Sequence, residues 1–100
     1  MNKTAVKDIT LKANQQVEPE FFDIEKNYER GLIGYSDAME LINEVVRQAS
    51  VRFLNEYLKG MLTIQEKEFA TCVVNKAACK SLMYITREEM KCIKSDKQYY

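Results

Sequence analysis

Apolar residues recur at helical spacing through most of the chain, and few residues interrupt them. The sequence has one proline, Pro19, and three glycines, Gly31, Gly34 and Gly60. Pro19 suits the first turn of a helix, where its missing N–H costs nothing, and Gly31 suits the position just after a helix end. The apolar spacing between these two residues predicts a helix over residues 19–30.

The longest amphipathic segment covers residues 35–59. Its first half places apolar residues on one face over 38–53 and charged residues on the opposite face. In its second half a separate apolar stripe lies a quarter to a half circle away at 100° per residue. This stripe consists of Val51, Leu54 and Leu58. We therefore expect one long helix that carries more apolar surface than a single core requires.

Two capping-box patterns divide the rest of the chain. Thr63 with Glu66 predicts a helix over 64–84, and Thr86 with Glu89 predicts a last short helix over 87–95. The segment 64–84 is apolar nearly all round, which is typical of a central helix.

The two ends of the chain have weaker patterns. Residues 1–17 fit a helical stripe as well as strand alternation, so we expect a short helix or a mobile arm there, followed by a linker over 14–17. Residues 96–100 are expected to form a frayed C-terminal tail. The fold prediction is an all-α, compact bundle of four helices, or five with an N-terminal one. The bundle domain covers 18–95, with short corners and one long central helix.

One segment repeats in outline. Residues 28–37 and 57–66 share a tyrosine, a basic residue, a glycine, two apolar residues, a capping position and an acid. A repeat unit is one interpretation. We favour the other, that the same helix–corner–helix connection occurs twice.

Charge changes the picture by its distribution. Fifteen basic residues balance fifteen acidic ones, so the chain lacks the overall positive charge that nucleic-acid binders use. Residues 18–44 hold eight acids and two bases, a net of −6, which leaves +6 for the remainder. These residues are either ordinary solvated helix faces or an acidic patch that meets a basic partner or the basic part of another copy.

The three cysteines, Cys72, Cys79 and Cys92, do not suggest a disulfide framework, because their number is odd. Cys72 and Cys79 lie two helical turns, about 10 Å, apart, which is too far for a disulfide. We interpret all three as reduced small apolar residues. The first residues lack an apolar signal region and no run reaches membrane-spanning length, so we expect a cytoplasmic protein of a cell or of an infected host.

The sequence contains no pattern typical of a catalytic site or a metal site. The chain has no histidine, which removes the commonest general base and the commonest zinc ligand. It also has no glycine-rich phosphate loop. Carboxylates one turn apart, Glu25 with Glu29 and Glu40 with Glu44, lie beside basic residues on polar faces. We therefore expect no enzyme activity, no metal and no cofactor.

With surplus apolar helix surface and no catalytic group, the sequence favours a non-enzymatic protein-binding module that acts as a regulator, adaptor or inhibitor and self-associates as a dimer. Small proteins of this kind are frequent among phage and mobile-element accessory proteins. The candidate partner-binding residues are Val51, Leu54, Leu58, Phe69, Lys76, Lys80, Tyr99 and Tyr100.

Three alternatives stay open. Leu54 and Leu58 can instead complete the core of the chain. The basic residues late in the sequence, from Lys76 to Lys97, favour a dimeric nucleic-acid-binding regulator as the second function. A small-molecule pocket in the bundle core, lined by Met39, Met61, Met83 and the cysteines, is the third.

Overall fold

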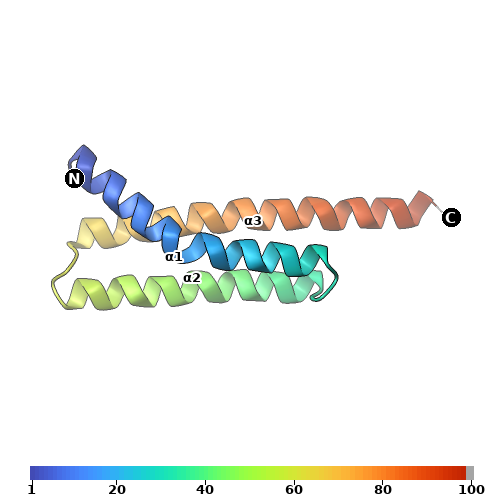
Figure 1. Ribbon diagram of the computed structural model, residues 1–100, viewed down its shortest axis with the longest axis horizontal. Helices are drawn as coiled ribbons and strands as arrows, with labels where there is room; N and C mark the ends of the chain where they lie inside the picture. The colour runs from blue at the N-terminus through green and yellow to red at the C-terminus, as the bar shows by residue number, and fades with distance from the viewer. Residues whose placement is uncertain (99–100) are drawn as a thin grey trace.

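The protein is a bundle of three long helices. The computed structural model describes the backbone of residues 1–98 and the side chains of residues 1–94. The helices are α1 (Lys3–Glu29), α2 (Tyr35–Leu58) and α3 (Ile64–Gln98). Figure 1 shows α1 and α3 running in the same direction with α2 antiparallel to both. The molecule measures 59 × 23 × 17 Å along its principal axes. The all-α prediction is confirmed, but the predicted number of four or five helices is wrong.

Helix α1 includes the N-terminal segment, for which the sequence predicted a short helix or a mobile arm. Asn2 caps it, because its side chain accepts a hydrogen bond of 2.8 Å from the N–H of Ala5. Ile9, Ala13 and Val17 are buried at a spacing of four residues, which continues directly into the stripe further along the helix. The prediction of a linker over 14–17 is therefore wrong, because its polar residues are helical and Val17 belongs to the core.

Pro19 lies inside α1 rather than at its first turn. Without an N–H it leaves the carbonyl of Gln15 without its helical partner, and its ring crowds that carbonyl, so the helix bends. Figure 1 shows the direction of α1 changing in this region, with the N-terminal half inclined to the rest of the bundle. The packing of apolar residues on both sides of Pro19 keeps the helix continuous across it.

The two corners of the bundle have the same construction. In the first, Gly31 has φ +74° and donates to Tyr28 O, while Leu32 donates to Asn27 O. In the second, Gly60 has φ +78° and the same two bonds recur at Tyr57 and Glu56. Both are Schellman motifs, which need a residue that tolerates positive φ. This agreement confirms that the two helix ends of the sequence echo are built alike, whereas the helix starts differ because Gly34 gives α2 no side-chain cap.

The capping box at the start of α3 is confirmed. The N–H of Glu66 donates to the hydroxyl oxygen of Thr63 at 3.1 Å, and the N–H of Thr63 donates to the carboxylate of Glu66 at 2.9 Å. Each side chain satisfies a backbone donor that the helix itself cannot satisfy.

Removing this cap gives a direct test of the corner. We expect Thr63→Ala to lower the free energy of unfolding by about 1 kcal/mol, because the N–H of Glu66 loses its acceptor. Urea denaturation followed by circular dichroism measures the change, with Thr71→Ala, which removes a hydroxyl from the interior of the same helix, as the comparison. Equal stability of the two variants would show that the Thr63 cap contributes nothing specific.

Helix α3 runs without a break through the second predicted capping box, so the separate helix over 87–95 is wrong. Thr86 and Glu89 make tertiary contacts instead of caps. The hydroxyls of Thr86 and Tyr35 lie 3.0 Å apart, and the hydroxyl of Tyr28 donates to the carboxylate of Glu89. No glycine or proline interrupts this segment, so a helix is free to propagate through it.

The core is a single column between the three helices, rich in alanine. Each helix contributes one buried stripe, and the largest fully buried side chains are Phe53, Ile42, Ile85, Val17 and Val74. Helix α3 buries one face only, whereas Cys72 and Cys79 are exposed. The expectation of an all-round buried central helix is therefore wrong, and the cysteines, interpreted as small apolar residues, lie at the surface. The apolar residues around the rest of α3 face outward.

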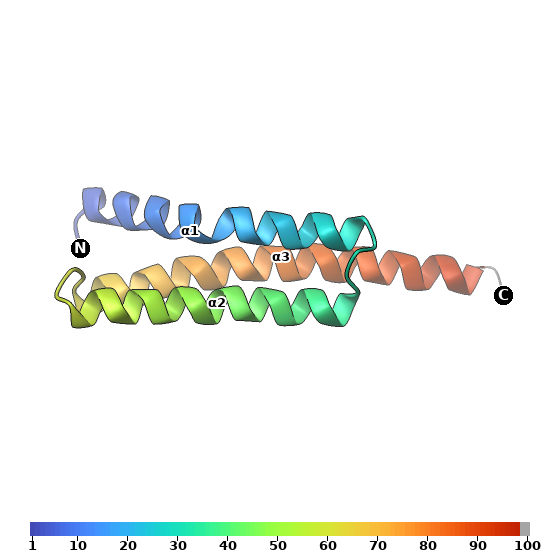
Figure 2. The ribbon, with the colours of Figure 1, turned by 60° about the horizontal axis from the view of Figure 1, so that its bottom comes forward.

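The C-terminal part of α3 extends beyond its neighbours. Figure 2 shows this end projecting past the corner that joins α1 to α2. The contacts of Tyr28 with Glu89 and of Tyr35 with Thr86 mark where the neighbouring helices end. Met90 and Ile93 beyond that level are exposed.

Candidate functional site

The first candidate surface is the predicted stripe on the outer face of α2. Val51 is 51% exposed, Leu54 is 41% exposed and Leu58 is 71% exposed. None of the three belongs to the core cluster or to the apolar residues packed against it. Neighbouring Phe53, on the opposite side of the same turn, is 1% exposed. The alternative that Leu54 and Leu58 complete the core is therefore wrong.

This stripe continues into the corner after α2, where Met61 is exposed as well. We define the α2 stripe as Val51, Leu54, Leu58 and Met61. Large aliphatic side chains of this kind are costly to leave in water, and a run of them marks a surface suited to contact with another macromolecule.

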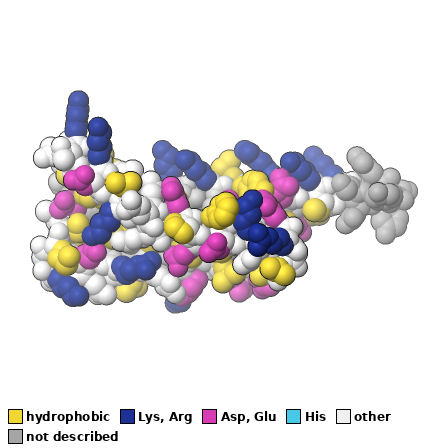
Figure 3. Space-filling model, in the orientation of Figure 1, with side chains coloured by type: hydrophobic (Ala, Val, Ile, Leu, Met, Phe, Trp, Pro, Cys, Tyr) yellow, Lys and Arg dark blue, Asp and Glu magenta, His cyan; other side chains and the backbone are white. Residues whose placement is uncertain are grey.

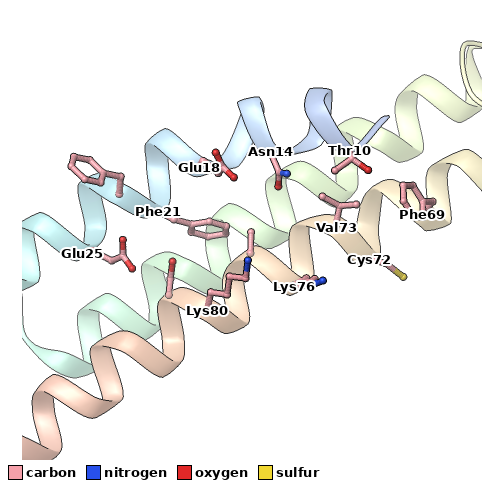
Figure 4. A pocket seen from close by; sticks show the side chains of 13 residues that line it. Thr10, Asn14, Glu18, Phe21, Glu25, Phe69, Cys72, Val73, Lys76 and Lys80 are labelled. Atoms are coloured by element: carbon pink, nitrogen blue, oxygen red, sulfur yellow. The ribbon is translucent and has the colours of Figure 1, made fainter. Parts of the chain in front are cut away.

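The second candidate surface is a groove of about 630 Å³ between α1 and α3. Phe21 is buried at its floor with Val73 and Ala77, and Phe69 lies at one end. Figure 4 shows Phe21 lying between the two helices, with Lys80 reaching toward the gap from α3. The groove is open along its length, so it offers a shallow apolar floor between two polar walls.

Two features of the sequence leave this groove unfilled at the surface between α1 and α3. Pro19 bends α1 within the stretch that lines the groove. On α3 the floor positions are occupied by small residues, Ala77 and Ser81, which fill little of the space between the helices. Larger side chains at these positions would close the groove.

The two walls of the groove carry opposite charges. Glu18 and Glu25 line it from α1, and Lys76 and Lys80 line it from α3. Among the described residues, none of these four charges forms an ion pair within the chain. Burial raises the pKa of Glu25, an effect that a hydrogen bond with Ser81 partly offsets. The walls thus present unneutralised charge to whatever approaches.

Beyond the groove the same side of α3 remains basic. Lys76, Lys80, Arg87, Lys91 and Lys94 are all exposed, and their spacing of three, four or seven residues places them on one strip. Figure 3 shows Lys and Arg side chains along the edge of the molecule formed by α3. At the end of the groove Tyr84 donates to Glu29, which lowers the pKa of Glu29 and raises that of Tyr84 to about 12.

The structure brings together three of the residues predicted from sequence. Phe69, Lys76 and Lys80 share the groove, separate from the α2 stripe, whereas Tyr99 and Tyr100 lie outside the described residues. Sequence reasoning missed the α1 wall. The available signal was the run Leu11, Glu18, Phe22 and Glu25, which repeats at three, four and seven residues on a face that the buried stripe does not use.

Other chemistry is sparse. All three cysteines are free and exposed. No group of three or more potential ligands lies together in the described part of the chain, and no described helix has the length and apolar character to cross a membrane. Met61, Met83 and the cysteines are exposed, whereas Met39 packs against the core. The alternative of a core pocket lined by these residues is therefore wrong.

Comparisons with protein-family models, with curated proteins and with solved structures find no match to this chain.

Proposed function

We propose that this protein is a non-enzymatic protein-binding module, a regulator, adaptor or inhibitor that occupies the surface of another protein through the α2 stripe. The observation that carries the proposal is the separation of two apolar faces on one helix. Phe53 and its buried neighbours serve the fold, whereas Leu54 and Leu58 have no part in the core. Interface energy commonly concentrates in a few large side chains of this kind.

The proposal is tested with Leu54→Asp combined with Leu58→Asp. Because both side chains are exposed, the variant should stay folded. We expect a loss of roughly 1–2 kcal/mol from helix propensity and from negative charge near a helix C-terminus. The measurement compares proteins captured by tagged wild-type chain and by the variant, together with thermal melting of both.

A matched control is Leu32→Asp, at the opposite end of α2, where the side chain is also strongly exposed. The expected result is a bound protein that survives high salt, is retained by Leu32→Asp and is lost with the double variant. If the double variant is unfolded, Leu54 and Leu58 belong to the core after all. If it is folded and still captures every bound protein, the α2 stripe is excluded as the binding surface.

The exposed basic strip of α3 favours one second candidate, a nucleic-acid-binding regulator. Binding through Lys76 to Lys94 would fall steeply with salt, because phosphate contacts release counterions. Titration of a duplex oligonucleotide at increasing salt distinguishes this function from apolar binding through the α2 stripe.

A further inference from the structure

The α1–α3 groove has a property that the α2 stripe lacks, namely an acidic wall facing a basic wall across an apolar floor. We define the groove face as the groove with the residues that continue its walls by helical spacing. Two turns before Glu18 lies Leu11, and two turns after Lys76 lies Met83. Leu11 is 59% exposed, while Phe22 and Met83 are each 55% exposed.

The levels of the two walls follow from the contacts between α1 and α3. Tyr84 with Glu29 and Tyr28 with Glu89 join residues 55 and 61 positions apart. Midway between these offsets Glu18 lies level with Lys76, and both line the groove. Continuing this offset along both helices places Leu11 near the level of Phe69, Phe22 near that of Lys80, and Glu25 near that of Met83, one helical turn from Lys80.

A face built in this way is complementary to itself. When two copies meet with a two-fold axis running along the groove, all helices stay parallel and α1 of each copy faces α3 of the other. Glu18 then meets Lys76 of the second copy at its own level, and Glu25 lies within the reach of Lys80. Leu11 and Phe22 meet the apolar parts of α3 near Phe69 and Met83.

The antiparallel alternative fails on charge. A two-fold axis across the groove places α1 against α1 and α3 against α3. Glutamates then face glutamates and lysines face lysines, and contacts between like charges are unfavourable. Among face-to-face pairs of the groove face, only the parallel arrangement is electrostatically complementary.

The size of the groove face is close to that of the smallest specific interfaces. From Leu11 to Glu29 it is about 27 Å long, and two helices give a width of roughly 20 Å. Two such faces together cover about 1,100 Å² in projection, which is close to the lower limit of about 1,200 Å² in total that specific interfaces bury. A nucleic acid on the same face would instead lie against Glu18, Glu25 and Glu29, which repel phosphate.

We propose that a second copy of the chain occupies the groove, in a parallel two-fold dimer held by reciprocal contacts of Glu18 and Glu25 with Lys76 and Lys80. This assigns the dimer expected from the sequence to the groove face and leaves the α2 stripe on the outside of each copy for another protein. For a face near the lower size limit we expect a dissociation constant on the order of micromolar, at the weak end of the range that specific interfaces span.

Charge exchange tests the dimer by sedimentation velocity over about 1–200 µM. One variant carries Lys76→Glu with Lys80→Glu, so both walls are acidic. Another carries Glu18→Lys with Glu25→Lys, so both walls are basic. We expect each alone to raise the dissociation constant at least about tenfold, and an equimolar mixture of the two to restore a dimer. All four substitutions in one chain should also restore it.

The matched control is Lys91→Glu with Lys94→Glu, which makes the same charge change on the same helix beyond the end of α1. This control should dimerise as the wild type does, and so should Leu54→Asp with Leu58→Asp. These variants therefore test the proposed dimer independently of the proposed binding function of the α2 stripe.

The dimer is overturned by a wild-type chain that sediments as a monomer throughout the range, or by single-wall variants that keep dimerising. Monomeric wild type that binds a 20-base-pair duplex, with loss in the Lys91 and Lys94 control, would assign the basic strip to phosphate instead. Circular dichroism checks that each variant is folded. For any variant that is not, two measurements take its place: the dimerisation of Lys76→Gln with Lys80→Gln, and the weakening of the wild-type dimer by salt.

Discussion

Phe53→Ala should lower the free energy of unfolding by about 3–5 kcal/mol. Phe53 is the largest of the fully buried side chains and is only 1% exposed. Truncation removes its contacts with the core and leaves a cavity that rigid helices on three sides fill only in part. A domain of this size has a total stability of roughly 5–15 kcal/mol, so the variant should be marginal at room temperature.

The informative comparison is Leu54→Ala, one residue further along the same helix. Leu54 lies on the outer face, and alanine has a better helix propensity, so we expect a change within about 0.5 kcal/mol. Urea denaturation of the two variants measures the difference directly. Losses of equal size would mean that α2 does not separate a core face from a free face, and would remove the basis for the α2 stripe as a binding surface.

The contrast between these two residues shows how far sequence patterns reach in this protein. In α2 the angular separation of the two stripes followed from helical geometry alone, and Gly31, Gly60 and the Thr63 cap fixed both corners. Each of these signals is local, because it depends on backbone conformation within one or two turns. Local signals therefore located α2 and the start of α3 to within a residue or two.

The failures arose where a local signal had a tertiary use. Pro19 is a good first-turn residue, yet the buried column formed by Ala13, Val17 and Phe21 holds the helix together on both sides of it. Thr86 and Glu89 match a capping box in residue type and spacing, yet their side chains contact Tyr35 and Tyr28. Which partner a threonine or glutamate takes depends on how the helices assemble, and a single sequence does not reveal that assembly.

The same reason explains what was found and missed at the groove. Phe69, Lys76 and Lys80 were apparent as one strip of a single helix. The opposite wall belongs to α1, and its Glu18 precedes Lys76 by 58 residues in the sequence. Only the parallel packing of α1 and α3 brings the two walls to face each other. Charge complementarity between the walls is a property of the pair, so neither helix predicts it alone.

Arg87→Pro should lower the free energy of unfolding by about 3 kcal/mol or more, because residue 87 lies in the interior of α3. The substitution removes an N–H from the helical ladder and places the proline ring against the carbonyl of Met83. The side chain that is lost is exposed, so Arg87→Ala should change stability by less than about 0.5 kcal/mol and serves as the control.

A helix starting at residue 87, as the second capping pattern suggested, would accept proline at its first position without penalty. Thermal and urea denaturation, with helix content from circular dichroism, separate the two cases. Equal stability of the proline and alanine variants would show that α3 is two helices after all, and would detach the C-terminal end from the groove face.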